Sequence, residues 1–128
     1  MKKILLVDDQ PAVLRVMRLG IEQAGYAIET AFDGREALEI VAASHPDFMV
    51  TDIDMPGMGG KDLCMAILER HPDRRFPIVV LTSRSELEHR NWTASIPNLT
   101  FIEKPVSMRQ LLAHIAASLA DVVEDSVA

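Results

Sequence analysis

Ile4-Leu5-Leu6-Val7-Asp8-Asp9 is the stretch that decides the fold of this 128-residue chain. Four consecutive apolar residues that end in two carboxylates are typical of a parallel strand buried on both faces. Pro11 follows closely and suits the first turn of a helix, where its missing N–H costs nothing. The stretch therefore predicts a strand that leads directly into a helix, as in a βαβ unit.

The same alternation of short apolar runs and helical patterns continues along the chain. It predicts strands at Ile4–Val7, Ala27–Ala31, Phe48–Thr51, Ile78–Leu81 and Leu99–Ile102. It predicts helices at Pro11–Ala24, Arg35–Ser44, Lys61–Arg70, Ser85–Thr93 and Met108–Leu119. Right-handed crossovers between such units place helices on both faces of a parallel sheet. The predicted fold class is doubly wound α/β.

Composition limits the classes of function. The formal charge of −6 argues against a nucleic-acid surface, because phosphate backbones bind clustered Lys and Arg. No apolar run approaches the ~20 residues that span a bilayer, so we expect no membrane association and a cytoplasmic location. The single cysteine, Cys64, is interpreted as a buried structural thiol. We expect one domain over residues 1–120, followed by an acidic tail at 121–128.

Polar residues follow four of the predicted strands: Asp8 and Asp9, then Asp52, Thr82 and Lys104. In doubly wound folds the carboxyl ends of the strands meet where ligands bind. Three crowded carboxylates repel one another unless a cation lies among them, and magnesium suits oxygen ligands of this kind. A hydroxyl and an ammonium stabilise phosphoryl oxygens, and an ionised carboxylate can attack phosphorus. The combination predicts magnesium-dependent phosphoryl transfer to Asp52.

Taken singly, these residues have ordinary structural explanations. An acidic pair after a strand often caps a helix. An aspartate before a Gly- and Pro-rich loop, such as Asp52 before Met55–Gly60, is a common turn residue. The prediction therefore depends on the whole set, at the ends of four different strands.

In these motifs the sequence resembles the receiver domains of two-component response regulators, including the single-domain chemotaxis regulator. The resemblance runs from Lys3 to about Leu119. It rests on Ile4–Asp9, Ala31–Gly34 with Glu36–Leu38, Pro46-Asp47, Asp52–Gly60, Leu81–Ser83 and Phe101–Pro105. It implies a flavodoxin-like (βα)5 sandwich whose five-stranded parallel sheet has the order 2-1-3-4-5.

The resemblance also implies a role for each matching residue. Asp52 is the expected phosphoacceptor and a metal ligand. Asp9 is expected to bind Mg²⁺ directly, Asp8 more loosely or through water, and Asp54 through its backbone carbonyl. Thr82 would bind a phosphoryl oxygen and Lys104 would pair with its charge. Phe101 is the expected switch aromatic, and the Lys104–Pro105 bond is expected to be cis.

Two further expectations concern the surroundings of this site. Asp54 and Arg84 carry opposite charges at its mouth, and we expect them to form an ion pair that obstructs water and slows loss of the phosphoryl group. The alternative is that both side chains point to solvent. Leu14 stands where the family often has Arg. With Val16 and Leu19 it is expected to add apolar surface for docking of the phosphoryl donor.

The expected partners also follow from the resemblance. A sensor histidine kinase or a histidine phosphotransfer protein would donate the phosphoryl group. An unidentified output protein would bind the face formed by Ser85–Thr93, Leu99–Ile102 and Met108–Leu119. We expect a monomer or a weak phosphorylation-dependent dimer. The chain is expected to be a signalling phosphoacceptor that catalyses only its own phosphorylation and dephosphorylation, rather than an enzyme.

Two other classes of protein share part of this pattern. Asp52-Ile53-Asp54 resembles the nucleophile motif of haloacid-dehalogenase-type phosphatases, but those proteins place that motif on their first strand. A flavin-binding protein of the same topology needs a hydroxyl-rich phosphate loop after the first strand. Asp8 and Asp9 occupy that loop here, and their charges would repel a phosphate.

Overall fold

The computed structural model describes residues 1–83, 92 and 94–127 of the chain. Its centre is a five-stranded parallel sheet with the order β2-β1-β3-β4-β5. The strands are β1 (Lys3–Val7), β2 (Ala27–Ala31), β3 (Phe48–Asp52), β4 (Ile78–Thr82) and β5 (Leu99–Glu103). The helices are α1 (Pro11–Gln23), α2 (Gly34–Ser44), α3 (Gly60–Arg70) and α5 (Met108–Val127). The doubly wound fold and the strand order are those expected from the sequence.

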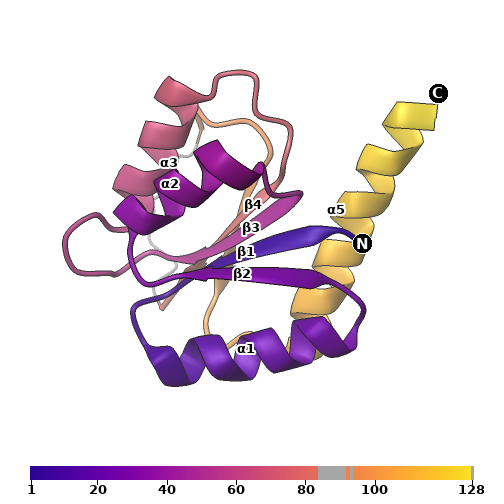
Figure 1. Cartoon of the computed structure of the whole chain (residues 1–128), viewed down its shortest axis with the longest axis horizontal. Coiled ribbons are helices and arrows are strands. Elements are labelled where there is room, and N and C mark those ends of the chain that lie inside the picture. Colours follow the sequence, from indigo (N-terminus) through magenta and orange to yellow (C-terminus); the bar gives the residue numbers. More distant parts are fainter. Residues whose placement is uncertain (84–91, 93, 128) are drawn as a thin grey trace.

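The helices form a layer on each side of the sheet: α2 and α3 cover one face, and α1 and α5 cover the other (Figure 1). Every residue of the inner strands β3 and β4 is buried, and so is all of the inner strand β1 except its first residue, whereas the edge strands β2 and β5 are mostly half-buried or exposed. Strands covered on both faces require continuous apolar runs, and the inner strands supply them at Ile4–Val7, Phe48–Val50 and Ile78–Leu81.

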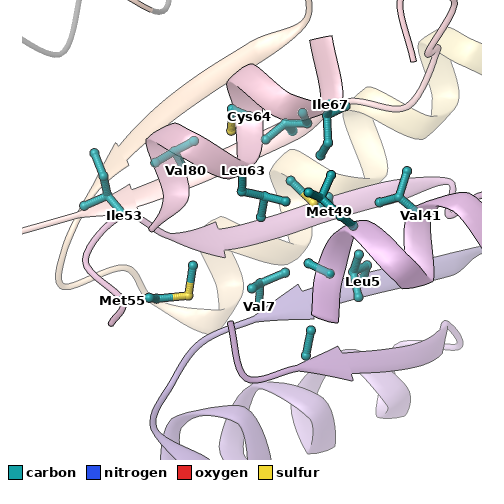
Figure 2. Close-up of a cluster of buried hydrophobic side chains, with 14 of the residues drawn as sticks. Leu5, Val7, Val41, Met49, Ile53, Met55, Leu63, Cys64, Ile67 and Val80 are labelled. Carbon is teal, nitrogen blue, oxygen red and sulfur yellow. The ribbon is translucent and has the colours of Figure 1, made fainter. Parts of the chain in front are cut away.

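Successive residues of each strand contribute to two separate cores, because side chains alternate between the faces of a sheet. Leu5, Val7, Met49 and Val80 point to the core shared with α2 and α3, as Figure 2 shows. The core on the opposite face contains Ile4, Leu6, Phe48, Val50, Val79 and Leu81 from the strands, and Leu14, Ile21, Leu111, Ile115 and Leu119 from α1 and α5.

The exposure of α1 corrects one expectation. Leu14 is only 5% exposed and belongs to the core beneath the sheet, so the prediction that it offers docking surface is wrong. Leu14 and Ile21 lie seven residues apart, which places them on the same face of the helix. Val16 and Leu19 are 68% and 59% exposed, and they are the large apolar side chains that this helix exposes.

Two segments differ from or fall outside the expected elements. The last helix, expected to end at Leu119, continues to Val127, because the sequence has no glycine or proline after Met108 to stop it. The helix expected at Ser85–Thr93 lies outside the described residues apart from Trp92. Within the described part of the chain, no helix is both long enough and apolar enough to cross a membrane.

The cores predict a contrast between two leucine substitutions. Leu5 has no exposed surface, so Leu5→Ala should lower the free energy of unfolding by about 2–5 kcal/mol through lost contacts and a residual cavity. The exposed Leu19 provides the matched control, and Leu19→Ala should change it by no more than about 0.5 kcal/mol. Urea denaturation of both variants measures the difference. Equal losses would contradict this assignment of the core.

Candidate functional site

Three carboxylates meet at the edge of the sheet where the strands end. β1 and β3 are neighbours, with Val7 opposite Thr51, so Asp8 and Asp52 emerge side by side. One oxygen from each of Asp8, Asp9 and Asp52 lies within 4.8 Å of the others. Asp8 and Asp52 are 3% and 5% exposed, and Asp9 is half-buried. The structure therefore concentrates negative charge in a largely buried place.

The carboxylate of Asp52 has two partners. Its Oδ1 lies 2.8 Å from Nζ of Lys104, which follows β5, and it accepts a hydrogen bond of 3.0 Å from the backbone N–H of Ile53. Hydrogen bonds to ionised groups are stronger than neutral ones, so these contacts fix the carboxylate. The lysine brings positive charge from a strand two places away in the sheet.

The carboxylate of Asp8 lies in an unfavourable electrostatic environment. Burial raises its pKa above the ordinary value, and the neighbouring charge of Asp52 acts in the same direction. A hydrogen bond of 2.9 Å from the backbone N–H of Gln10 and the charge of Lys104 oppose this rise. Buried carboxylates that repel one another in this way suit a hard divalent cation with oxygen ligands, such as Mg²⁺.

Thr82 and Lys104 are joined through the backbone beside the cluster. Thr82 is 3% exposed at the end of β4, and its carbonyl oxygen accepts a 2.7 Å hydrogen bond from the N–H of Lys104. The Lys104–Pro105 peptide bond is cis, as the resemblance implied. The ends of β1, β3, β4 and β5 thus all contribute to one site.

Phe101 contacts a residue that the sequence analysis did not single out. Its ring packs edge-on against Trp92, with 5.5 Å between the ring centroids and an interplanar angle of 84°. Trp92 is 9% exposed, and its indole Nε1 finds no hydrogen-bond partner among the residues that the structure describes. The signal available was that Trp92 is the only tryptophan of the chain, in a segment with a weak helical pattern.

The loop after Asp52 is held by close packing. A Cβ atom added to Gly60 would lie 2.5 Å from the carbonyl oxygen of Asp52, so only glycine allows α3 to begin so near β3. Ile53 and Met55, shown in Figure 2, anchor the loop in the core shared with α2 and α3. Asp54 between them is exposed. Its expected partner, Arg84, lies outside the described residues, so that ion pair stays a prediction.

The sequence of the chain is similar to those of known response regulators. Residues 4–116 match the family model of the response regulator receiver domain. Response regulator MprA of Mycolicibacterium vanbaalenii is 35% identical over 96% of this chain, and MprA of Mycobacterium leprae is 36% identical over 98%. These matches cover 52% and 54% of the relatives, so the chain spans about half their length.

Solved structures agree. A CheY-like receiver domain from Methanospirillum hungatei superposes with a TM-score of 0.87 at 28% identity, covering 98% of both chains. TrrA of Thermotoga maritima, in complex with Mg(2+)-BeF, superposes with a TM-score of 0.80 at 27% identity, covering 92% of this chain and 99% of TrrA. The chain belongs to the receiver domain family of response regulators, the signalling proteins of two-component systems.

The raised pKa of Asp8 predicts a gain in stability when its charge is removed. The folded protein holds the Asp8 proton to higher pH than the unfolded chain does, so stability falls as pH rises through the folded pKa. In magnesium-free buffer at pH 7, Asp8→Asn should therefore raise the melting temperature, and the gain should shrink as pH falls below that pKa. Thermal scans over a pH series measure this.

Asp47→Asn is the control for that series. Asp47 accepts a 2.8 Å hydrogen bond from the N–H of Lys3 at the opposite edge of the sheet, so its substitution should not raise the melting temperature. A lower melting temperature for Asp8→Asn at pH 7 would show that its hydrogen bond with Gln10 outweighs the cost of burial.

Proposed function

We propose that this receiver domain accepts a phosphoryl group on Asp52 from a histidine kinase or a histidine phosphotransfer protein, in a magnesium-dependent step. The observation that carries the proposal is the carboxylate of Asp52, buried among Asp8 and Asp9 and paired at 2.8 Å with Lys104. A merely structural aspartate does not need two further carboxylates beside it, because they destabilise the fold.

The chemistry is a displacement at phosphorus. An oxygen of Asp52 forms a bond to phosphorus while the bond from phosphorus to the imidazole nitrogen of the donor breaks, and the electron pair of that bond stays on the imidazole. The product is an acyl phosphate. Lys104 and the hydroxyl of Thr82 are placed to stabilise the phosphoryl oxygens, because both emerge beside Asp52 from the next strands of the sheet.

The acidic cluster would hold the magnesium ion. Asp9 and Asp52 would supply direct carboxylate ligands, Asp8 a more distant one through water, and Asp54 its backbone carbonyl. A bound Mg²⁺ neutralises phosphoryl oxygens as charge moves between them. The residues present fit that ion because all of the ligands are oxygens and two of the carboxylates are buried.

The signal would leave the site through Thr82 and Phe101. Movement of Thr82 toward a phosphoryl oxygen frees space for Phe101, whose ring packs on Trp92, so a change in Phe101 alters that aromatic pair. The surface formed by β5 and α5 would present this change to the output partner. The domain would work in the cytoplasm as a switch that catalyses only its own phosphorylation and dephosphorylation.

The donor would dock on α1. This helix starts at Pro11, close to Asp9, and carries Val16 and Leu19 as an exposed apolar pair three residues apart. The exposed side chains of Arg15 and Arg18 lie beside this pair. An amphipathic helix of the donor could cover the apolar pair and bring its histidine to the carboxyl edge of the sheet.

The phosphatase alternative finds no support in the family match. The fold explains why: Asp52 ends the third strand of the chain and the acidic pair follows the first, the reverse of the arrangement in that class.

Chemical phosphorylation tests whether Asp52 is the phosphoacceptor. With acetyl phosphate and Mg²⁺, intact mass spectrometry should show one added phosphoryl group on the parent and none on Asp52→Ala. Asp9→Asn should be labelled at least about tenfold more slowly, which corresponds to a barrier higher by about 1.4 kcal/mol, because it lacks a direct metal ligand. Asp47→Asn, at the opposite edge, should be labelled like the parent. A phosphorylated Asp52→Ala would overturn the assignment.

Substitutions on α1 separate docking of the phosphohistidine donor from phosphoryl transfer to Asp52. Val16→Glu with Leu19→Glu should slow transfer from the cognate phosphohistidine donor at least about tenfold, because burying charges against an apolar partner is costly. Labelling by acetyl phosphate should not change. Ala12→Glu with Gln23→Glu, at exposed positions nearer the ends of α1, adds the same charge as a control. If both double variants slow transfer equally, charge repulsion rather than the apolar pair explains the loss.

A further inference from the structure

A cavity lies at the edge of the sheet opposite the acidic site, where the strands begin (the side on which Figure 1 places the N-terminus). Its volume is about 410 Å³. It is enclosed by the turn before β3, at residues 45–47, and by the connection from α3 to β4, at residues 70–76. Val41, Pro46 and Leu119 form an apolar floor. We refer to it as the amino-edge cavity.

Among the described residues that line the amino-edge cavity, positive charge predominates, although the whole chain carries −6. Its charged lining residues are Lys2, Arg70, Arg74 and Arg75 against Asp47 and Asp73. The carboxyl ends of α2 and α3 also lie here, at His45 and His71, and each contributes a partial charge of about −0.5. These partial charges offset only about half of the excess of two positive side chains.

One cation and one anion of the lining already serve the fold. The guanidinium of Arg74 donates hydrogen bonds to the carbonyl oxygens of Phe76, Pro97 and Asn98, and it lies 5.6 Å from the centre of the Phe76 ring. Asp47 accepts from the N–H of Lys3 at 2.8 Å. Arg74 is thereby fixed in the wall, and burial lowers its pKa, a cost that a nearby anion would relieve.

Three cations remain without a bound counter-charge. Among the described residues, no ion pair or hydrogen bond engages the side chains of Lys2, Arg70 or Arg75, and all three are exposed at the rim. The guanidinium group of an arginine can donate two parallel hydrogen bonds to the oxygens of one phosphate. A compact anion with two or more negative charges can therefore bind several of these cations at once. The rim therefore favours a polyanion over a single carboxylate.

The interior of the cavity adds an apolar requirement. Phe76 lines it above the floor, and its ring is held by Arg74. A volume of about 410 Å³ lies in the range of about 300–1,000 Å³ typical of sites for small organic ligands. A flat ring would cover the apolar surface while its charged group stays at the rim.

We propose that the amino-edge cavity binds a small phosphate-bearing ligand with an aromatic ring, the class to which nucleoside diphosphates belong. The site is separate from Asp52 and does not depend on phosphorylation. Contact with the turn that enters β3 and with Leu119 of α5 would let such a ligand affect both the phosphoacceptor strand and the last helix.

The test uses ADP in buffer with EDTA, so that the acidic cluster at the other edge holds no metal. Titration followed by NMR should shift the amide signals of His45, Asp47, His71 and residues 73–76, and leave those of Asp8, Asp9 and Lys104 in place. Pyrophosphate, which lacks the ring, and adenosine, which lacks the charge, should each bind at least about tenfold more weakly, a difference of about 1.4 kcal/mol.

Arg70→Gln with Arg75→Gln should weaken ADP binding at least about tenfold in calorimetry. The control removes the same charge from the exposed Lys61 and Arg109, near the starts of α3 and α5, and should bind ADP like the parent. Both double variants should still be phosphorylated by acetyl phosphate and Mg²⁺, which shows that they are folded. No binding, shifts at the acidic cluster, equal affinity of the two double variants, or pyrophosphate binding as tightly as ADP would each overturn the proposal.

Discussion

Repulsion among Asp8, Asp9 and Asp52 is the interaction on which the rest of the site depends. Their oxygens lie within 4.8 Å of one another in a largely buried place, and burial raises the pKa of Asp8. The fold tolerates this cost because Lys104, Gln10 and Ile53 direct a cation and two backbone N–H groups at the carboxylates. A site that is destabilised in this way binds added positive charge strongly, which is what metal-assisted phosphoryl transfer requires.

The parallel sheet gives its two edges different chemistry. All five strands end at the edge that carries the acidic site, and the amino-edge cavity, whose charged lining residues are mainly Lys and Arg, lies where they begin. The inner strands β3 and β4, which run between these two edges, are buried on both faces. A ligand at one edge can therefore influence the other only through elements that reach both, and β3, which runs from the turn at residues 45–47 to Asp52, is the most direct of these.

Helix α1 and the aromatic pair show where pattern alone misleads. Leu14, Val16 and Leu19 are equally apolar in sequence, yet Leu14 is buried against the sheet and the other two face outward. The helical period predicts which residues share a face, but the rotation of a helix about its axis depends on the sheet and on α5. Trp92 and Phe101 are nine residues apart in the sequence, and no local pattern predicts the contact between their rings.

The sequence by itself determined the fold class, the strands, most helices, and the residues at the ends of the strands, because burial on both faces writes continuous apolar runs that end in polar residues. The strand order came from the family resemblance. Only the tertiary structure decided the distances among Asp8, Asp9 and Asp52, the close approach that requires Gly60, and the cationic lining of the amino-edge cavity. Each of these brings together residues from distant strands and loops, and no local pattern records such contacts.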